Sequence, residues 1–94
     1  MQLILYSKPG CHLCEGLQEK LAQVRNPQFE LEIRDITSRP DWFQAYQYEI
    51  PVLCWVSEGG VSPAEKALPR ISPRASAAQV ARLLQKYIGE SVGE

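Results

Sequence analysis

The segment LILYSKPGCHLC, residues 3–14, determines how the fold begins and carries the most reactive groups of the chain. Leu3 to Ser7 are mostly strand-forming residues, and Pro9-Gly10 ends that run with a turn signal. Cys11 and Cys14 follow directly, with two residues between them, where a helix would begin. The segment therefore predicts a strand, a tight turn and a helix with two thiols in its first turn.

Apolar residues beyond the turn continue at helical spacing. They recur at intervals of four, four and three residues, which is typical of a helix with one buried face. These residues are Leu13, Leu17, Leu21 and Val24. Because proline disfavours the helical conformation in the residue before it, this helix must stop before Asn26-Pro27.

The following residues also alternate between strand and helix patterns. Apolar and charged side chains alternate over residues 29–36, which predicts a strand with one solvated face. A second helix is expected with Ser38 as its N-cap and Pro40 in its first turn. One side of this helix carries aromatic residues: Trp42, Phe43 and Tyr46. Residues 50–56 are apolar throughout, as in a central strand covered on both faces.

The last third of the chain predicts a hairpin and a helix. The clearest turn signal is SEGG, residues 57–60, and a weak strand at residues 67–72 follows it. Pro69 places that strand at the sheet edge. Ser76 and Gln79 form a capping-box pair that begins a last amphipathic helix. The order predicts an α/β fold, β-α-β-α-β-β-α, with a mixed four-stranded sheet flanked by helices.

Length and composition agree with one domain that spans residues 1–94. Ten Lys and Arg against eleven Asp and Glu give a formal net charge of -1, and without a basic stripe we expect no nucleic-acid partner. No apolar run approaches a membrane span, and the first residues do not resemble a signal peptide. We therefore expect a cytoplasmic protein without membrane contact, and nothing in the sequence requires more than a monomer.

The positions of the two clustered cysteines suit thiol chemistry. A thiol attacks as the thiolate, and a helix N-terminus lowers its pKa from an ordinary value of about 8.5. Lys8 and His12 would add positive potential near Cys11, although His12 is equally plausible as a solvated helix residue. Cys14 lies about one helical turn further on, within reach of a mixed disulfide at Cys11. We therefore expect Cys11 to attack and Cys14 to resolve.

Other interpretations of the cysteines are weaker. Both could be core residues, but Cys11 lies where the start of a helix is exposed. A structural zinc site commonly takes two cysteine pairs, and His12 and Cys54 do not supply a second pair. Glu15 rather than histidine follows Cys14, which excludes c-type haem attachment. We expect no bound metal or cofactor, and we expect Cys54 to be a buried strand residue.

The Ile50-Pro51 pair is the second unusual feature. A proline at the start of a buried strand removes a hydrogen-bond donor from the sheet. A cis bond would leave the preceding backbone turned outward and free to pair with an extended peptide. A trans proline that simply begins the strand fits the residues equally well.

Three features together resemble the glutaredoxin-like branch of the thioredoxin superfamily, over nearly the whole chain: LILYSKPGCHLC, IPVL at residues 50–53 and a terminal amphipathic helix. The resemblance implies a thioredoxin-like fold, dithiol–disulfide exchange at Cys11 and Cys14, and a cis bond at Ile50-Pro51 beside them. It also implies that the Ile50 backbone pairs with the cysteinyl part of glutathione and that Lys8 holds a glutathione carboxylate. The candidate substrate-binding residues are thus Lys8, His12, Ile50 and Pro51.

The chain departs from the glutaredoxin pattern at three places. His12-Leu13 replaces Pro-Tyr between the cysteines, and Glu49-Ile50-Pro51 replaces Thr-Val-Pro. RISPRASA, residues 70–77, replaces the Gly-Gly and Asp turn that cradles the rest of glutathione. Candidate anion binders in this segment are Arg70, Arg74 and Ser76.

These features predict a thiol–disulfide oxidoreductase, and the alternative is a thioredoxin-fold module that binds or senses redox state without turnover. Its substrates would be proteins with disulfides or small thiols. The departures leave the reductant open between glutathione, as a co-substrate, and a thioredoxin reductase.

Overall fold

The computed structural model describes residues 2–25, 28–57 and 64–89. The elements, in chain order, are β1 (Gln2–Ser7), α1 (His12–Gln23), β2 (Glu30–Asp35), the 3-10 turn η1 (Ile36–Ser38), α2 (Pro40–Tyr46), β3 (Val52–Ser57), β4 (Ala64–Ala67), α3 (Ala77–Leu84) and the π-helical turn η2 (Gln85–Gly89). The four strands form one sheet in the order β2-β1-β3-β4. β1 pairs in parallel with β2 and antiparallel with β3, and β3 pairs antiparallel with β4. The predicted α/β fold with a mixed four-stranded sheet is therefore confirmed.

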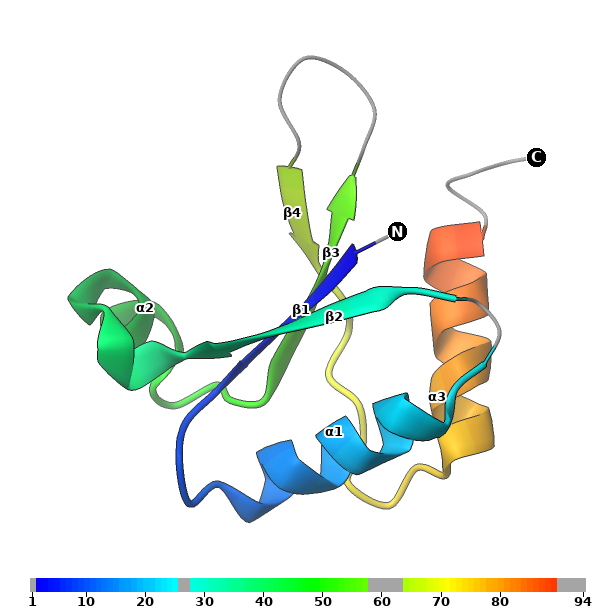
Figure 1. Ribbon diagram of the computed structural model, residues 1–94, viewed down its shortest axis with the longest axis horizontal. Helices are drawn as coiled ribbons and strands as arrows, with labels where there is room; N and C mark the ends of the chain where they lie inside the picture. Colours follow the sequence, from blue (N-terminus) through cyan, green and yellow to red (C-terminus); the bar gives the residue numbers. More distant parts are fainter. Residues whose placement is uncertain (1, 26–27, 58–63, 90–94) are drawn as a thin grey trace.

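The helices divide between the two sides of the sheet. α1 and α3 pack against each other, and Figure 1 shows α2 at the opposite end of the molecule from α3. Alternate residues of β1 point to these two sides, so the strand contributes to two hydrophobic cores. Leu3 and Leu5 belong to the core under α1 and α3, whereas Ile4 and Tyr6 belong to the core under α2. Full burial of one such leucine contributes roughly 1.5–3 kcal/mol.

The two ends of the last helix follow the sequence signals. The Ser76 hydroxyl accepts a hydrogen bond from the Gln79 N–H (3.1 Å), and the Gln79 side chain accepts one from the Ser76 N–H (2.8 Å). Val80 and Leu84 are fully buried against the sheet. The predicted capping box is therefore confirmed, and it fixes where α3 begins.

Two local predictions were wrong. The edge strand is β4 at Ala64–Ala67, and residues 68–72 are not a strand, because Pro69 has no N–H to continue the ladder after Leu68 donates to the Leu53 carbonyl. Ser38 does not cap α2, because its hydroxyl donates to the Asp35 carbonyl and the helix begins with Pro40. The predicted turn at residues 57–60 lies, beyond Ser57, outside the described residues.

The charged face predicted for β2 is not simply solvated. Five side chains join on the α2 side of the sheet in what we call the sheet-face network: Gln2, Tyr6, Glu32, Arg34 and Glu65. The Arg34 guanidinium donates to Glu32 (2.6 Å), to Glu65 (2.8 Å) and to the Tyr6 hydroxyl (2.9 Å). Its side chain is only 20% exposed. The network joins β2 and β4, the two edge strands, across the middle of the sheet.

Burial and hydrogen bonding shift the pKa values of side chains in this network. Burial raises the pKa of Tyr6, and the hydrogen bond that its hydroxyl donates to Glu65 (2.6 Å) raises it further. Burial alone would raise the pKa of Glu65, but the hydrogen bonds from Tyr6 and Arg34 lower it overall. Cys54 lies buried in the core under α2, and burial raises the pKa of its thiol. The prediction that Cys54 is a buried strand residue is therefore confirmed.

Candidate functional site

A tight turn delivers the first cysteine to the start of α1. The Cys11 N–H donates to the Lys8 carbonyl (3.2 Å), which closes a four-residue turn with proline second and glycine third. Gly10 has φ +83°, a backbone conformation that side chains with a Cβ rarely adopt. The Pro9-Gly10 pair therefore sets the direction in which the chain enters the helix.

The two cysteines form a disulfide in the first turn of the helix. Cys11 is the N-cap residue of α1, and its sulfur accepts a hydrogen bond from the Cys14 N–H (3.2 Å). The Cα atoms of Cys11 and Cys14 are 5.3 Å apart. Cys14 is 3% exposed, whereas Cys11 is partly exposed. The helix N-terminus and the Cys14 N–H would stabilise a thiolate at Cys11 once the disulfide is reduced.

Two adjoining cavities form what we call the dithiol groove beside this helix turn. The first, of about 220 Å³, lies against the cysteine motif and is lined by residues that include His12, Leu13 and Ile71. The second, of about 290 Å³, lies further along β3 and is lined by residues that include Val52 and Leu53. Both cavities share four lining residues: Leu17, Pro51, Arg70 and Ile71. The groove is thus continuous across Pro51.

The Ile50-Pro51 bond is cis, as the family resemblance implied. Pro51 lines both halves of the groove, so the structure brings it next to the cysteine-bearing turn. The Ile50 N–H donates to the Tyr46 carbonyl (3.1 Å), and its side chain packs into the core under α2.

The other two candidate binding residues differ in position. The His12 side chain is 95% exposed, lies 3.8 Å from the Glu15 carboxylate and lines the first cavity. Lys8 is exposed and is not among the residues that line either cavity. A contact between Lys8 and a substrate therefore stays a prediction.

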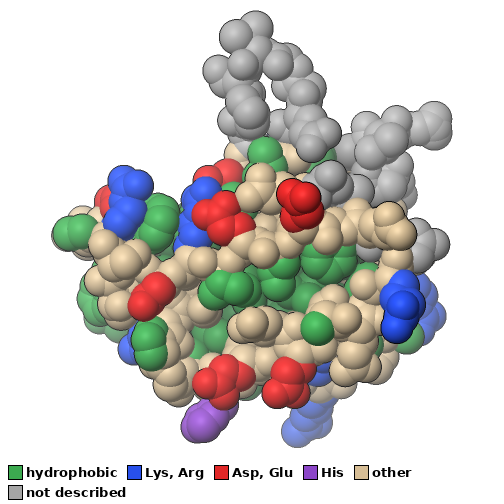
Figure 2. Space-filling model, in the orientation of Figure 1, with side chains coloured by type: hydrophobic (Ala, Val, Ile, Leu, Met, Phe, Trp, Pro, Cys, Tyr) green, Lys and Arg blue, Asp and Glu red, His purple; other side chains and the backbone are tan. Residues whose placement is uncertain are grey.

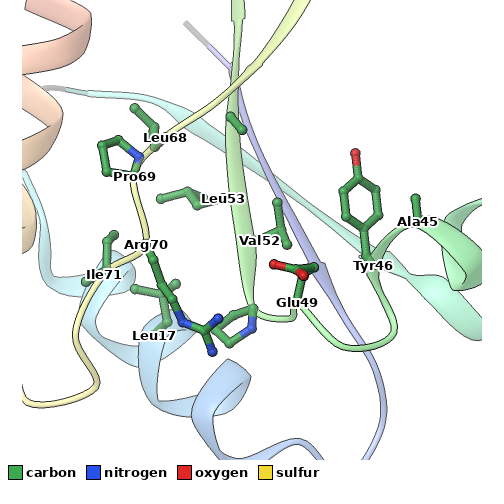
Figure 3. A pocket seen from close by; sticks show the side chains of 12 residues that line it. Leu17, Ala45, Tyr46, Glu49, Val52, Leu53, Leu68, Pro69, Arg70 and Ile71 are labelled. Carbon is green, nitrogen blue, oxygen red and sulfur yellow. The ribbon is translucent and has the colours of Figure 1, made fainter.

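Charged side chains also line the groove. Figure 3 shows Arg70 and Glu49 extending into it from different segments, Arg70 from the chain after β4 and Glu49 from the turn before Pro51. Lys20 lines the first cavity, and its ammonium donates to the Pro73 carbonyl (2.6 Å). Lys20 therefore ties α1 to the segment that forms the opposite wall.

The outer side of α1 carries acidic side chains. Glu15 and Glu19 are exposed there, and Figure 2 shows acidic side chains along the edge that α1 forms. A hydrophobic band lies above them, between α1 and β2. Negative charge thus borders the helix on its outer side, and Glu49 brings a further carboxylate to the groove side.

The structure separates the three residues that the sequence suggested as anion binders. Arg70 lines both cavities, whereas Arg74 lines neither. The Ser76 hydroxyl is used as the cap of α3. The sequence singled out Glu49 and residues 70–77 as departures from the glutaredoxin pattern, and the structure places Glu49 and residues 70–73 in the groove walls. The sequence did not indicate Leu68 and Pro69 as wall residues, although Pro69 signals the end of the pairing between β3 and β4.

The described residues contain neither a metal-binding cluster nor a membrane-spanning helix. Within residues 2–25, 28–57 and 64–89, no three His, Cys, Asp or Glu side chains are grouped so that they could hold a metal ion. No helix in this part of the chain has the length and apolar character needed to span a membrane.

Comparisons with known proteins agree with this geometry. The family model for the glutaredoxin-like domain (DUF836) matches residues 2–85. A structural genomics target protein, XcR50 from X. campestris, superposes with a TM-score of 0.58 at 28% identity, covering 89% of this chain and 96% of that one. Thioredoxin 1 from Thermosipho africanus TCF52B superposes with a TM-score of 0.63 at 17% identity over 98% and 99% of the two chains, which shows a shared fold. No curated protein matches the chain.

Proposed function

The chain belongs to the glutaredoxin-like domain family, and from this premise we propose that it is a thiol–disulfide oxidoreductase. One observation carries the proposal. Cys11 caps α1 and is disulfide-bonded to the buried Cys14, beside a groove that has a cis proline in its wall. An attacking thiol needs stabilisation as a thiolate and access to substrate, and a resolving thiol needs only access to the first.

The reaction takes place in two exchange steps. The Cys11 thiolate attacks one sulfur of a substrate disulfide, which forms a mixed disulfide and releases the other substrate sulfur as a thiolate. The Cys14 thiol then gives up its proton and attacks the Cys11 sulfur, which closes the Cys11–Cys14 disulfide and releases the second substrate thiolate. Two electrons have passed to the substrate, and an external thiol such as glutathione, or a thioredoxin reductase, returns two electrons to the pair.

The remaining groups serve binding in this proposal. His12 and Pro51 line the first cavity beside the cysteine motif and would contact substrate there, whereas Lys8 and the Ile50 carbonyl would contact substrate outside it. We propose that the protein works as a cytoplasmic monomer on protein disulfides or small thiols.

Intact-mass measurement in buffers of stepped reduced-to-oxidised glutathione ratio tests the proposal. We expect loss of the two thiol hydrogens with a defined midpoint, and a glutathione or substrate adduct trapped at Cys11 in Cys14→Ser. Cys54→Ala is the matched control and should oxidise at the same midpoint. No disulfide at any ratio would contradict the proposal and favour a binding module without turnover.

A further inference from the structure

Arg70 lies at the junction of the two cavities that form the dithiol groove. It lines both cavities together with Leu17, Pro51 and Ile71, so it stands where the two halves meet. It belongs to the segment between β4 and α3, and Figure 3 shows its side chain extending into the groove. A ligand that passes from the cysteine motif over Pro51 would therefore pass the Arg70 guanidinium.

Arg70 forms no hydrogen bond or ion pair with the described part of the chain. Glu49 lies within the same cavity, yet no ion pair joins the two side chains. Lys20, the other cation of the groove, already donates to the Pro73 carbonyl. Arginine binds carboxylates through two parallel hydrogen bonds, so a carboxylate in the groove would find its counterpart at Arg70.

Apolar side chains form much of the wall on both sides of Arg70. Leu13, which is 50% exposed, lies with Ile71 in the first cavity, and Leu53 lies with Leu68 in the second. Apolar walls favour ligands that bring apolar side chains to both halves. Glutathione has carboxylates but no apolar side chain, whereas an extended polypeptide can supply an acidic residue and apolar residues together.

We propose that Arg70 selects the substrate: an extended polypeptide segment that carries an acidic side chain close to its reacting cysteine and apolar residues on either side. This inference rests on the proposed oxidoreductase function, because it names the substrate of that same groove. Arg70 acts in it as a substrate-binding residue, and the thiol chemistry stays with Cys11 and Cys14.

The test uses three synthetic peptide disulfides that differ at one position beside the cysteine, with Glu, Gln or Lys there. The reduced wild-type protein should reduce the Glu peptide with a kcat/KM about fivefold above that of the Gln peptide, and the preference should shrink as salt is added. Arg70→Gln should abolish the preference, so that the Glu and Gln peptides are reduced with equal kcat/KM. Arg70→Glu should favour the Lys peptide instead.

Arg74→Gln is the matched control, since Arg74 belongs to the same segment but lines neither cavity. It should keep the wild-type preference. Equal rates on the Glu and Gln peptides in the wild type, or a preference that survives Arg70→Gln, would overturn the inference while leaving the oxidoreductase function intact. If Arg70→Gln slows reduction of oxidised glutathione and spares every peptide, Arg70 binds a glutathione carboxylate and the polypeptide assignment fails. Failure of the wild type to reduce any disulfide would overturn the function itself.

Discussion

The sheet-face network and the dithiol groove each contain an arginine beside apolar side chains. The arginine of the network is paired with carboxylates, whereas the arginine of the groove has no such partner among the described residues. Arg34 hydrogen-bonds to Glu32, Glu65 and Tyr6. Arg70 has no such partner in the part of the chain that the structure describes, although Glu49 lines the same cavity. The first arginine is thus satisfied within the molecule, and the second is available to a ligand.

The positions of the two regions explain the difference. The network spans the sheet from one edge strand to the other, where an unpaired charge would weaken the fold. The groove follows α1 and Pro51 beside the cysteine motif, where the proposed exchange reaction requires space for a substrate. We therefore expect substitutions in the network to change stability and substitutions in the groove to change exchange.

Substitution of the attacking thiol has the largest expected effect. Cys11→Ser should lower disulfide reduction by at least about a thousandfold, because a serine hydroxyl cannot replace the thiolate as nucleophile. Chemical denaturation of the reduced protein should show an unchanged free energy of unfolding. If Cys14→Ser left Cys11 unmodified and Cys11→Ser stayed active, the roles of the two cysteines would be reversed.

Alkylation of the reduced protein compares the Cys11 thiol with the Cys54 thiol, which lies in the core under α2. Cys11 should react with iodoacetamide at neutral pH about a hundredfold faster than Cys54, because Cys54 is buried and its pKa is raised by burial. Mass spectrometry of digested samples, taken at timed intervals, gives both rates. Comparable rates in the native protein would mean that the core under α2 opens easily.

Local spacing predicted most of the fold because the signals are short-range. The turn at Pro9-Gly10 and the capping box at Ser76 depend on residues within a few positions of each other. β4 was misplaced because AEKA, residues 64–67, has no strand-forming side chains. It becomes a strand only through its pairing with β3, as in Glu65 opposite Val56.

The site was predicted at its cysteines and only in part at its walls. Cys11, Cys14 and Pro51 belong to recognisable local patterns. The position of Arg70 in the groove wall depends instead on how residues 68–73 pack against distant parts of the chain. The Arg34–Glu65 pair likewise joins residues 31 positions apart, so alternation alone could not show that the polar face of β2 is covered. Long-range pairing decides both cases.

Removal of a network charge should destabilise the fold without changing exchange. Arg34→Met leaves Glu32 and Glu65 without their cation, and we expect a loss of about 1–2 kcal/mol in the free energy of unfolding, reduced from the cost of a fully buried pair because both carboxylates are partly solvated. Urea denaturation measures it. Asp41→Asn breaks the exposed Arg39–Asp41 pair as a control and should cost under about 1 kcal/mol.

The smallest expected effect is the contribution of Glu65 to the pH dependence of the free energy of unfolding. Its pKa is lowered in the folded protein, so its contribution to stability is complete above its unfolded pKa, about 4.3, and is lost as the pH falls through the lower folded value. Asp35 and Asp41, whose pKa values are also lowered, contribute with the same sign. The free energy of unfolding, measured by urea between about pH 6 and pH 3, should therefore decline less steeply in Glu65→Gln than in the wild type. Equal slopes would mean that the hydrogen bonds from Tyr6 and Arg34 do not favour the ionised Glu65, and the network would then stabilise the sheet by packing and not by charge.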